Sequence, residues 1–145
     1  MTPIAAIQAV RAVYAELACL PLQRSCSTLT ECCRFRLTGR TPYLTRGESF
    51  VAASAWRATG RTSIPRPSDG ACPFLATHGR CQIYDGRPFG CRTHFCDAAG
   101  GPYRRSDVRN LIRQLETIDA QLGGCGAMNL LTALQHTLAA SRQAR

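Results

Sequence analysis

The chain has 145 residues, of which 45% are hydrophobic, and this length suits one domain built around one core. The hydrophobic content excludes a disordered tail, and no apolar run reaches the roughly 18 residues needed to span a bilayer. Eighteen basic residues, all of them arginine, stand against nine acidic ones and give a formal net charge of +9. The nine cysteines are several times the usual share for a soluble protein.

The N-terminal segment 2–20 is apolar enough to suggest a signal peptide, but no basic leader precedes it, and Arg11 and Glu16 interrupt it. We therefore expect a cytoplasmic protein, in which thiols stay reduced. An odd number of cysteines also leaves one thiol outside any closed disulfide framework. In that compartment, dense cysteine usage points to metal or redox chemistry.

Four segments carry apolar residues at the 3.6-residue period of a helix with one buried face. Thr2 and Pro3 provide the N-cap and the first position of the first helix, and its predicted buried stripe begins at Ile4. Thr45 and Glu48 form a capping box at the start of the second helix. The four predicted helices cover residues 2–20, 45–60, 106–122 and 129–141.

The middle of the chain, residues 60–103, has seven glycines, five prolines and only about eight large apolar residues. Strand-like pieces are short: 34–37, 74–76 and 81–84, with the last two predicted to form a hairpin. Ordering this middle segment costs about 1 kcal/mol per residue, whereas each buried apolar side chain returns roughly 1.5–3 kcal/mol. The segment must therefore dock on the helices or be crosslinked, and metal binding can supply that folding energy.

The cysteines divide into two groups and two outliers. Cys19 and Cys125 lie in or beside helical pattern, and we expect them to be small buried hydrophobes. The predicted metal ligands are the clustered members: Cys26, Cys32 and Cys33 in the first group, and Cys72, Cys81, Cys91 and Cys96 in the second.

Cys32 and Cys33 are adjacent, which leaves two arrangements open. On an extended backbone their side chains point to opposite faces, so they would serve two sites or one of them would pack. A turn would instead let both face one centre. His94, between Cys91 and Cys96, is the stronger histidine candidate, and with the seven cysteines it would complete two four-ligand centres.

Other histidines carry less weight as ligands. His78 falls in the loop of the predicted hairpin, and we expect it to be a loop residue, with ligation as the alternative. His136 lies on the last predicted helix, and we expect it to be a surface or packing residue.

Five motifs occur in a fixed order along the chain. They are Cys26-Ser-Thr-Leu-Thr-Glu-Cys32-Cys33-Arg-Phe, Leu44-Thr45-Arg-Gly-Glu48, Cys72-Pro-Phe-Leu, Gly79-Arg-Cys81-Gln-Ile-Tyr84 and Arg87-Pro-Phe-Gly-Cys91-Arg-Thr-His-Phe-Cys96. Over about residues 26–96 this set resembles the YkgJ-type cysteine-cluster proteins, described as zinc- or iron-chelating or as Fe–S-cluster-containing. The resemblance implies that the seven clustered cysteines include the metal ligands.

The chain departs from the family's frequent pattern Cys-x2-Cys-x2-Cys-Cys, because Leu29 stands at the second cysteine. That departure favours centres assembled from both cysteine groups. The spacing fits neither common ferredoxin run, since Ala99 falls where a plant-type third cysteine would be, nor the paired knuckles of a zinc ribbon. The family description favours an iron–sulfur cluster or iron modestly, with zinc as the alternative.

Arg87 and Arg92 flank the third cysteine of the second group. We hypothesise that they donate hydrogen bonds to cluster thiolates or to neighbouring carbonyls, since such donors tune metal centres.

The sequence as a whole predicts an α+β, mostly helical single domain over residues 1–145, with about four helices around an irregular, cysteine-rich, metal-organised middle with short strands. The predicted function is metal binding with a role in redox chemistry, electron transfer or metal and cluster handling, and the candidate partners are a metal ion or cluster and an unknown protein redox partner. If it is an enzyme, an iron–sulfur oxidoreductase component fits better than a stand-alone catalyst. Two other classes are a zinc-stapled module binding nucleic acid or an acidic protein, and a thiol enzyme with a nucleophilic cysteine near His94.

Overall fold

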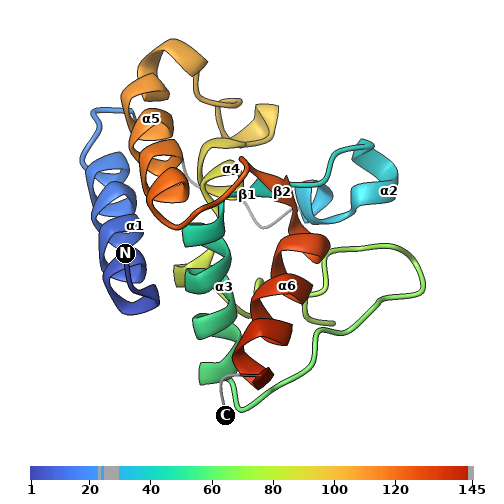
Figure 1. Ribbon diagram of the computed structural model, residues 1–145. Helices are drawn as coiled ribbons and strands as arrows, with labels where there is room; N and C mark the ends of the chain where they lie inside the picture. Colours follow the sequence, from blue (N-terminus) through green and yellow to red (C-terminus); the bar gives the residue numbers. More distant parts are fainter. Residues whose placement is uncertain (23, 25–29, 144–145) are drawn as a thin grey trace.

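The computed structural model describes residues 1–22, 24 and 30–143, and four long helices form its frame (Figure 1). All four helices predicted from the sequence are confirmed, with ends shifted by one or two residues. They are α1 (Pro3–Ala18), α3 (Arg46–Ala58), α5 (Arg105–Gln121) and α6 (Leu130–Gln143), which together are called the helical frame below. None of the described helices is both long and apolar enough to cross a membrane.

The helix ends follow from capping chemistry that the sequence specifies. Thr2 Oγ1 accepts a hydrogen bond from Ala5 N at 3.2 Å, with Pro3 at the first helical position. At α3 the capping box is complete, because Thr45 Oγ1 accepts from Glu48 N while Glu48 Oε2 accepts from Thr45 N at 2.9 Å.

The frame buries its apolar side chains in two clusters that meet at α3. One lies between α1, α3 and α5, and the other between α3, α6 and the segment 72–83. In the second cluster Trp56 and Phe74 pack with ring centroids 5.2 Å apart, so the frame directly supports the irregular segment. The predicted stripe of α1 is wrong at Ile4, which is 72% exposed, because the buried face runs instead through Ala6 and Val13.

The sheet is smaller than the sequence suggested and lies elsewhere. Strands β1 (Tyr43–Leu44) and β2 (Met128–Asn129) pair antiparallel, a pairing between distant segments that no local pattern predicts. The predicted hairpin is reduced to one bridge between Leu75 and Cys81. The predicted strand at 34–37 is wrong.

That segment forms a short helix instead, α2 (Phe35–Thr38). Gly39 adopts a φ of +64° and donates its N–H to Phe35 O at 2.9 Å, which closes a single helical turn. Four further short elements contain cysteines or lie within a few residues of one. They are the helix α4 (Phe89–Thr93) and the 3₁₀ helices η1 (Glu31–Cys33), η2 (Tyr84–Gly86) and η3 (Asp97–Ala99).

In space, α1 and α5 lie side by side, α3 runs through the centre, and α6 packs on its other side (Figure 1). The sheet β1–β2 and the helices α2 and α4 lie beyond one end of α3. The helix α4, which carries Cys91, therefore lies at this end of the helical frame, in contact with β1.

Candidate metal centre

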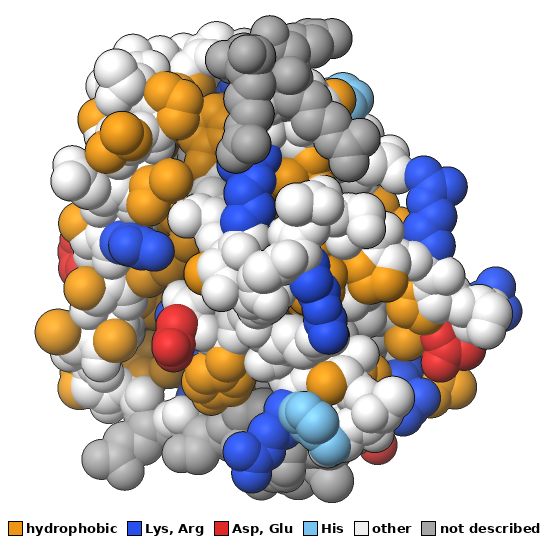
Figure 2. Space-filling view, turned by 90° about the horizontal axis from the view of Figure 1, so that it is seen from below, with side chains coloured by type: hydrophobic (Ala, Val, Ile, Leu, Met, Phe, Trp, Pro, Cys, Tyr) orange, Lys and Arg blue, Asp and Glu red, His pale blue; other side chains and the backbone are white. Residues whose placement is uncertain are grey.

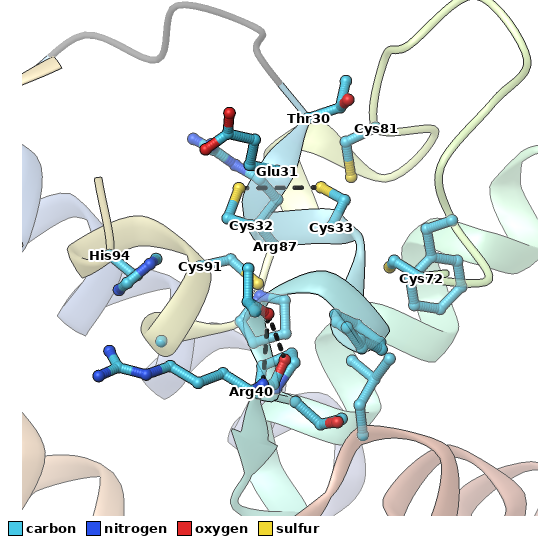
Figure 3. Close-up of a pocket in the computed structure, with 18 of the residues that line it drawn as sticks. Thr30, Glu31, Cys32, Cys33, Arg40, Cys72, Cys81, Arg87, Cys91 and His94 are labelled. Carbon is cyan, nitrogen blue, oxygen red and sulfur yellow. Dashed lines mark hydrogen bonds between the residues drawn. The ribbon is translucent and has the colours of Figure 1, made fainter. Parts of the chain in front are cut away.

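One cavity of about 670 Å³ brings cysteines of both groups together (Figure 3). The turns that carry them, η1, the segment 72–84, α4 and the residues up to η3, are called the cavity wall below. Among the described residues, six cysteines line it: Cys32, Cys33, Cys72, Cys81, Cys91 and Cys96. Cys26, also predicted as a ligand, lies outside the described residues.

Cys19 and Cys125 do not belong to the cavity, and the prediction that they are buried is wrong, since both are exposed. Cys19 caps the end of α1, and Cys125 lies in the loop after α5, where neither meets a packed face. Both thiols are thus available as controls for experiments on the cavity.

The two cysteine groups are joined by the backbone. Cys72 N donates to Cys33 O at 2.7 Å, and this bond fastens η1 to the segment 72–84. Within that segment, Gln82 N donates to Phe74 O at 2.8 Å beside the bridge at Cys81. Short hydrogen-bonded turns, rather than a sheet, therefore bring these three cysteines to one cavity.

Two arrangements were left open for Cys32 and Cys33, and the structure shows the one in which a turn lets both side chains face one cavity. Both residues lie in η1, and their sulfurs are 4.0 Å apart on the same cavity (Figure 3). The residue before η1, Thr30, has a φ of +60°, which costs a β-branched residue about 1–3 kcal/mol. The chain is strained here at the point where it turns both thiols inward.

A buried carboxylate holds the helix that carries Cys91. Glu48 is only 3% exposed, and its Oε1 accepts hydrogen bonds from Phe89 N at 2.8 Å and from the Tyr14 hydroxyl at 3.3 Å. Burial raises the pKa of both Glu48 and Tyr14. The capping motif identified Glu48 as a helix cap, but its contact with Phe89, 41 residues away, has no signal in the sequence.

The thiols of the cavity perturb one another. Burial raises the pKa of Cys72 to about 12, and burial together with Cys72 and Cys81 raises the pKa of Cys91. The contact between the adjacent sulfurs, assisted by the Arg87 charge, lowers the pKa of Cys32 to about 6. The same contact raises the pKa of Cys33, and burial of Cys33 is the second cause of this increase. Cys32 is thus more readily ionised than Cys33, Cys72 and Cys91, and metal ligation requires the thiolate.

The donor set fits a soft metal. Tetrahedral zinc with Zn–S bonds of about 2.3 Å separates its sulfurs by about 3.8 Å, close to the 4.0 Å between Cys32 and Cys33. Among the described residues, however, no three histidine, cysteine or acidic side chains converge tightly enough to hold an ion. Chelation by these residues therefore requires the cavity wall to draw its sulfurs closer together.

The two arginines have different positions. Arg87 lines the cavity, donates from Nε to Tyr84 O at 2.9 Å, and places its guanidinium 3.6 Å from the centre of the Tyr84 ring. Arg92 is not among the described residues that line the cavity, but it donates to Arg87 O at 2.8 Å and to Asp85 O. Arg92 therefore braces the loop that carries Arg87.

The histidines are separated by the structure. His94 lines the cavity with Cys91 and Cys96, whereas His78 is exposed and is not among its described lining residues. His136 is exposed on α6, as predicted. His94 is therefore the histidine placed to contribute to a metal centre.

A family model named CxxCxxCC, described as “Putative zinc- or iron-chelating domain”, matches residues 23–117, well over half of the chain. The chain belongs to this family. No curated protein and no solved structure matches the chain. The CxxCxxCC match confirms the family resemblance read from the motifs. It spans all seven clustered cysteines and leaves out Cys19 and Cys125, the same division that the cavity makes among the described cysteines.

Proposed function

We propose that the cavity binds a metal centre through cysteine thiolates and that this centre is an iron–sulfur cluster. The observation that carries the proposal is the convergence of both cysteine groups on one cavity, in a chain of a zinc- or iron-chelating family. The ligands are drawn from Cys26, Cys32, Cys33, Cys72, Cys81, Cys91 and Cys96.

The number of thiols and the space between them favour a centre larger than one ion. A single zinc ion takes four ligands and would leave a cavity of about 670 Å³ mostly unfilled. A bound cluster would supply one-electron transfer at a potential set by its surroundings. Arg87 would contribute positive charge beside the thiolates, and Arg92 would keep Arg87 in place. The corresponding role is redox, electron transfer or cluster handling.

Purification under anaerobic conditions tests the proposal. We expect a coloured protein that contains iron and acid-labile sulfide in near-equal amounts. A colourless protein with stoichiometric zinc would overturn the iron–sulfur centre and leave a zinc site in the same cavity. A cooperatively folded protein free of any metal would overturn both.

A second candidate, a zinc-stapled module that binds nucleic acid or an acidic protein, is favoured by one feature of α5. Arg105, Arg109 and Arg113 follow one another at successive turns and line a shallow hollow. Their guanidiniums make no hydrogen bond or ion pair with any described residue. Like charges four residues apart destabilise a helix, and a bound polyanion would relieve that repulsion.

The arginines elsewhere give this second candidate less support. On the face seen in Figure 2 they stand singly among apolar and neutral atoms rather than in one patch. Binding to duplex DNA or single-stranded RNA, measured at rising salt, tests the module: Arg105→Gln/Arg109→Gln should weaken binding and flatten its salt dependence. Absence of binding at low salt would remove this candidate.

A further inference from the structure

The charges around the cavity have one predominant sign. Among its described lining residues are three arginines, Arg40, Arg80 and Arg87, and one carboxylate, Glu31. None of the three guanidiniums forms an ion pair within the described residues, where the one ion pair joins Arg34 to Asp69. The lining therefore stays net positive even when Cys32 is counted as a thiolate.

Two of these arginines are free to meet a ligand. Arg87 is held by Tyr84 O and by the Tyr84 ring. Arg40 and Arg80 are exposed, and their guanidiniums make no hydrogen bond with any described residue. In Figure 3, Glu31 lies beside Cys32, and Arg40 lies at the opposite end of the labelled group. The carboxylate therefore does not neutralise Arg40.

A positively charged lining repels a hydrated divalent cation and attracts an anion. We infer that the cavity takes its metal from a small anionic chelate, a complex in which carboxylates hold the metal and leave a net negative charge. The inference rests on the proposed function, because it names the substrate of the same site. Guanidiniums bind carboxylates through two parallel hydrogen bonds, which suits Arg40 and Arg80 to hold such a donor.

The volume of the cavity selects a small donor over a protein. At about 670 Å³ it lies within the roughly 300–1,000 Å³ range of small-molecule pockets. The metal transfer is a ligand exchange with no change of oxidation state, and assembly of an iron–sulfur cluster would take its sulfide from a separate sulfide donor. Each thiol that binds the metal releases its proton to water and replaces one carboxylate oxygen of the donor, and the freed carboxylates carry their negative charge away from the cavity.

The test follows metal loading of the full-length metal-free protein by stopped flow, with cobalt(II) as a probe whose thiolate complexes absorb visible light. Cobalt is supplied either as the hydrated ion or as its citrate complex. Ionic strength rises from about 0.01 M to about 0.15 M, which shortens the Debye length from about 30 Å to about 8 Å. We expect loading from citrate to slow by about threefold to tenfold, and loading of the hydrated ion to accelerate.

Paired variants separate the cavity from the net charge of the protein. Arg40→Gln/Arg80→Gln should abolish the salt dependence of loading from citrate, whereas Arg105→Gln/Arg109→Gln, an equal charge change on α5, should preserve it. Loading from citrate that does not fall with salt, or that Arg40→Gln/Arg80→Gln leaves unchanged, would overturn the inference alone. Loading from neither source would overturn the proposed function as well.

Discussion

The helical frame and the cavity wall hold their residues by different means. The frame buries apolar side chains of α1, α3, α5 and α6 in two clusters. Caps such as Thr45 with Glu48 at the start of α3 fix where its helices begin. The wall consists of short turns, and only a few of its side chains, among them Phe74 and Ile83, reach the core. The frame should therefore fold on apolar burial alone, whereas the wall depends on contacts with the frame and on a ligand.

Metal removal should separate the two regions most strongly. A ligand present at about a thousandfold above its Kd stabilises the folded state by about 4 kcal/mol, and this stabilisation is lost with the metal. We expect a chelator to lower the unfolding temperature markedly while the helical circular dichroism below the transition is kept. An unchanged unfolding temperature would mean that the wall is as self-sufficient as the frame.

The pH dependence of stability should have opposite signs with and without metal. In the metal-free protein, burial raises the pKa of Cys72 from about 9 to about 12, so folding favours the neutral thiol. That stabilisation is fully present below pH 9 and is lost as the pH rises toward 12. With metal bound, the ligands are thiolates, and stability is lost instead as protons compete at falling pH. The lowered pKa of Cys32 has the opposite effect, but only between about pH 6 and 9. Denaturant titrations of the metal-free form across pH 9–12 and of the metal-bound form across pH 5–9 therefore check the two signs. Metal-free stability that does not fall above pH 9 would contradict this account.

A truncation in the frame should cost stability in both forms equally. Leu134 on α6 is fully buried in the second cluster, and Leu134→Ala should lower the free energy of unfolding by about 3 kcal/mol. Because the side chain does not line the cavity, the metal content of the folded protein should stay at the wild-type level. Denaturant unfolding with metal analysis measures both quantities, and a loss of metal would show that the regions are not separable.

Glu48→Gln tests the contact through which the frame positions the wall. Glutamine keeps the shape, but its amide nitrogen cannot accept the bond from Thr45 N or Phe89 N that the carboxylate accepts. We expect a loss of about 1–3 kcal/mol and a metal affinity lowered beyond that of Leu134→Ala, because Phe89 begins the helix that carries Cys91. Equal affinities in the two variants would make Glu48 a helix cap and nothing more.

The same contrast explains what the sequence could predict. Helix caps and apolar periodicity are local, so all four long helices were predicted close to their observed ends. The pairing of Tyr43 with Asn129 and the bond from Phe89 to Glu48 join distant segments, which local patterns do not report. At residues 34–37 the pattern was too short to separate strand from helix, and the turn at Gly39 decided it.

For the site, the division of the cysteines was predictable from their spacing and from the family motifs. That Cys32 and Cys33 face one cavity was not, because it depends on the turn after Thr30. The burial predicted for Cys19 and Cys125 was wrong because apolar character alone does not place a residue against a partner.

The central claim is that the cysteine-lined cavity is the metal site, and the cysteines themselves provide its most direct test. Metal content per chain would be compared between the wild type, Cys72→Ser, Cys91→Ser and the control Cys19→Ser/Cys125→Ser, all purified anaerobically. The control should keep the wild-type metal content and lose less than about 0.5 kcal/mol of stability. Cys72→Ser and Cys91→Ser should each lose most of the metal. Full metal content in both cavity variants, or its loss in the control, would contradict the account.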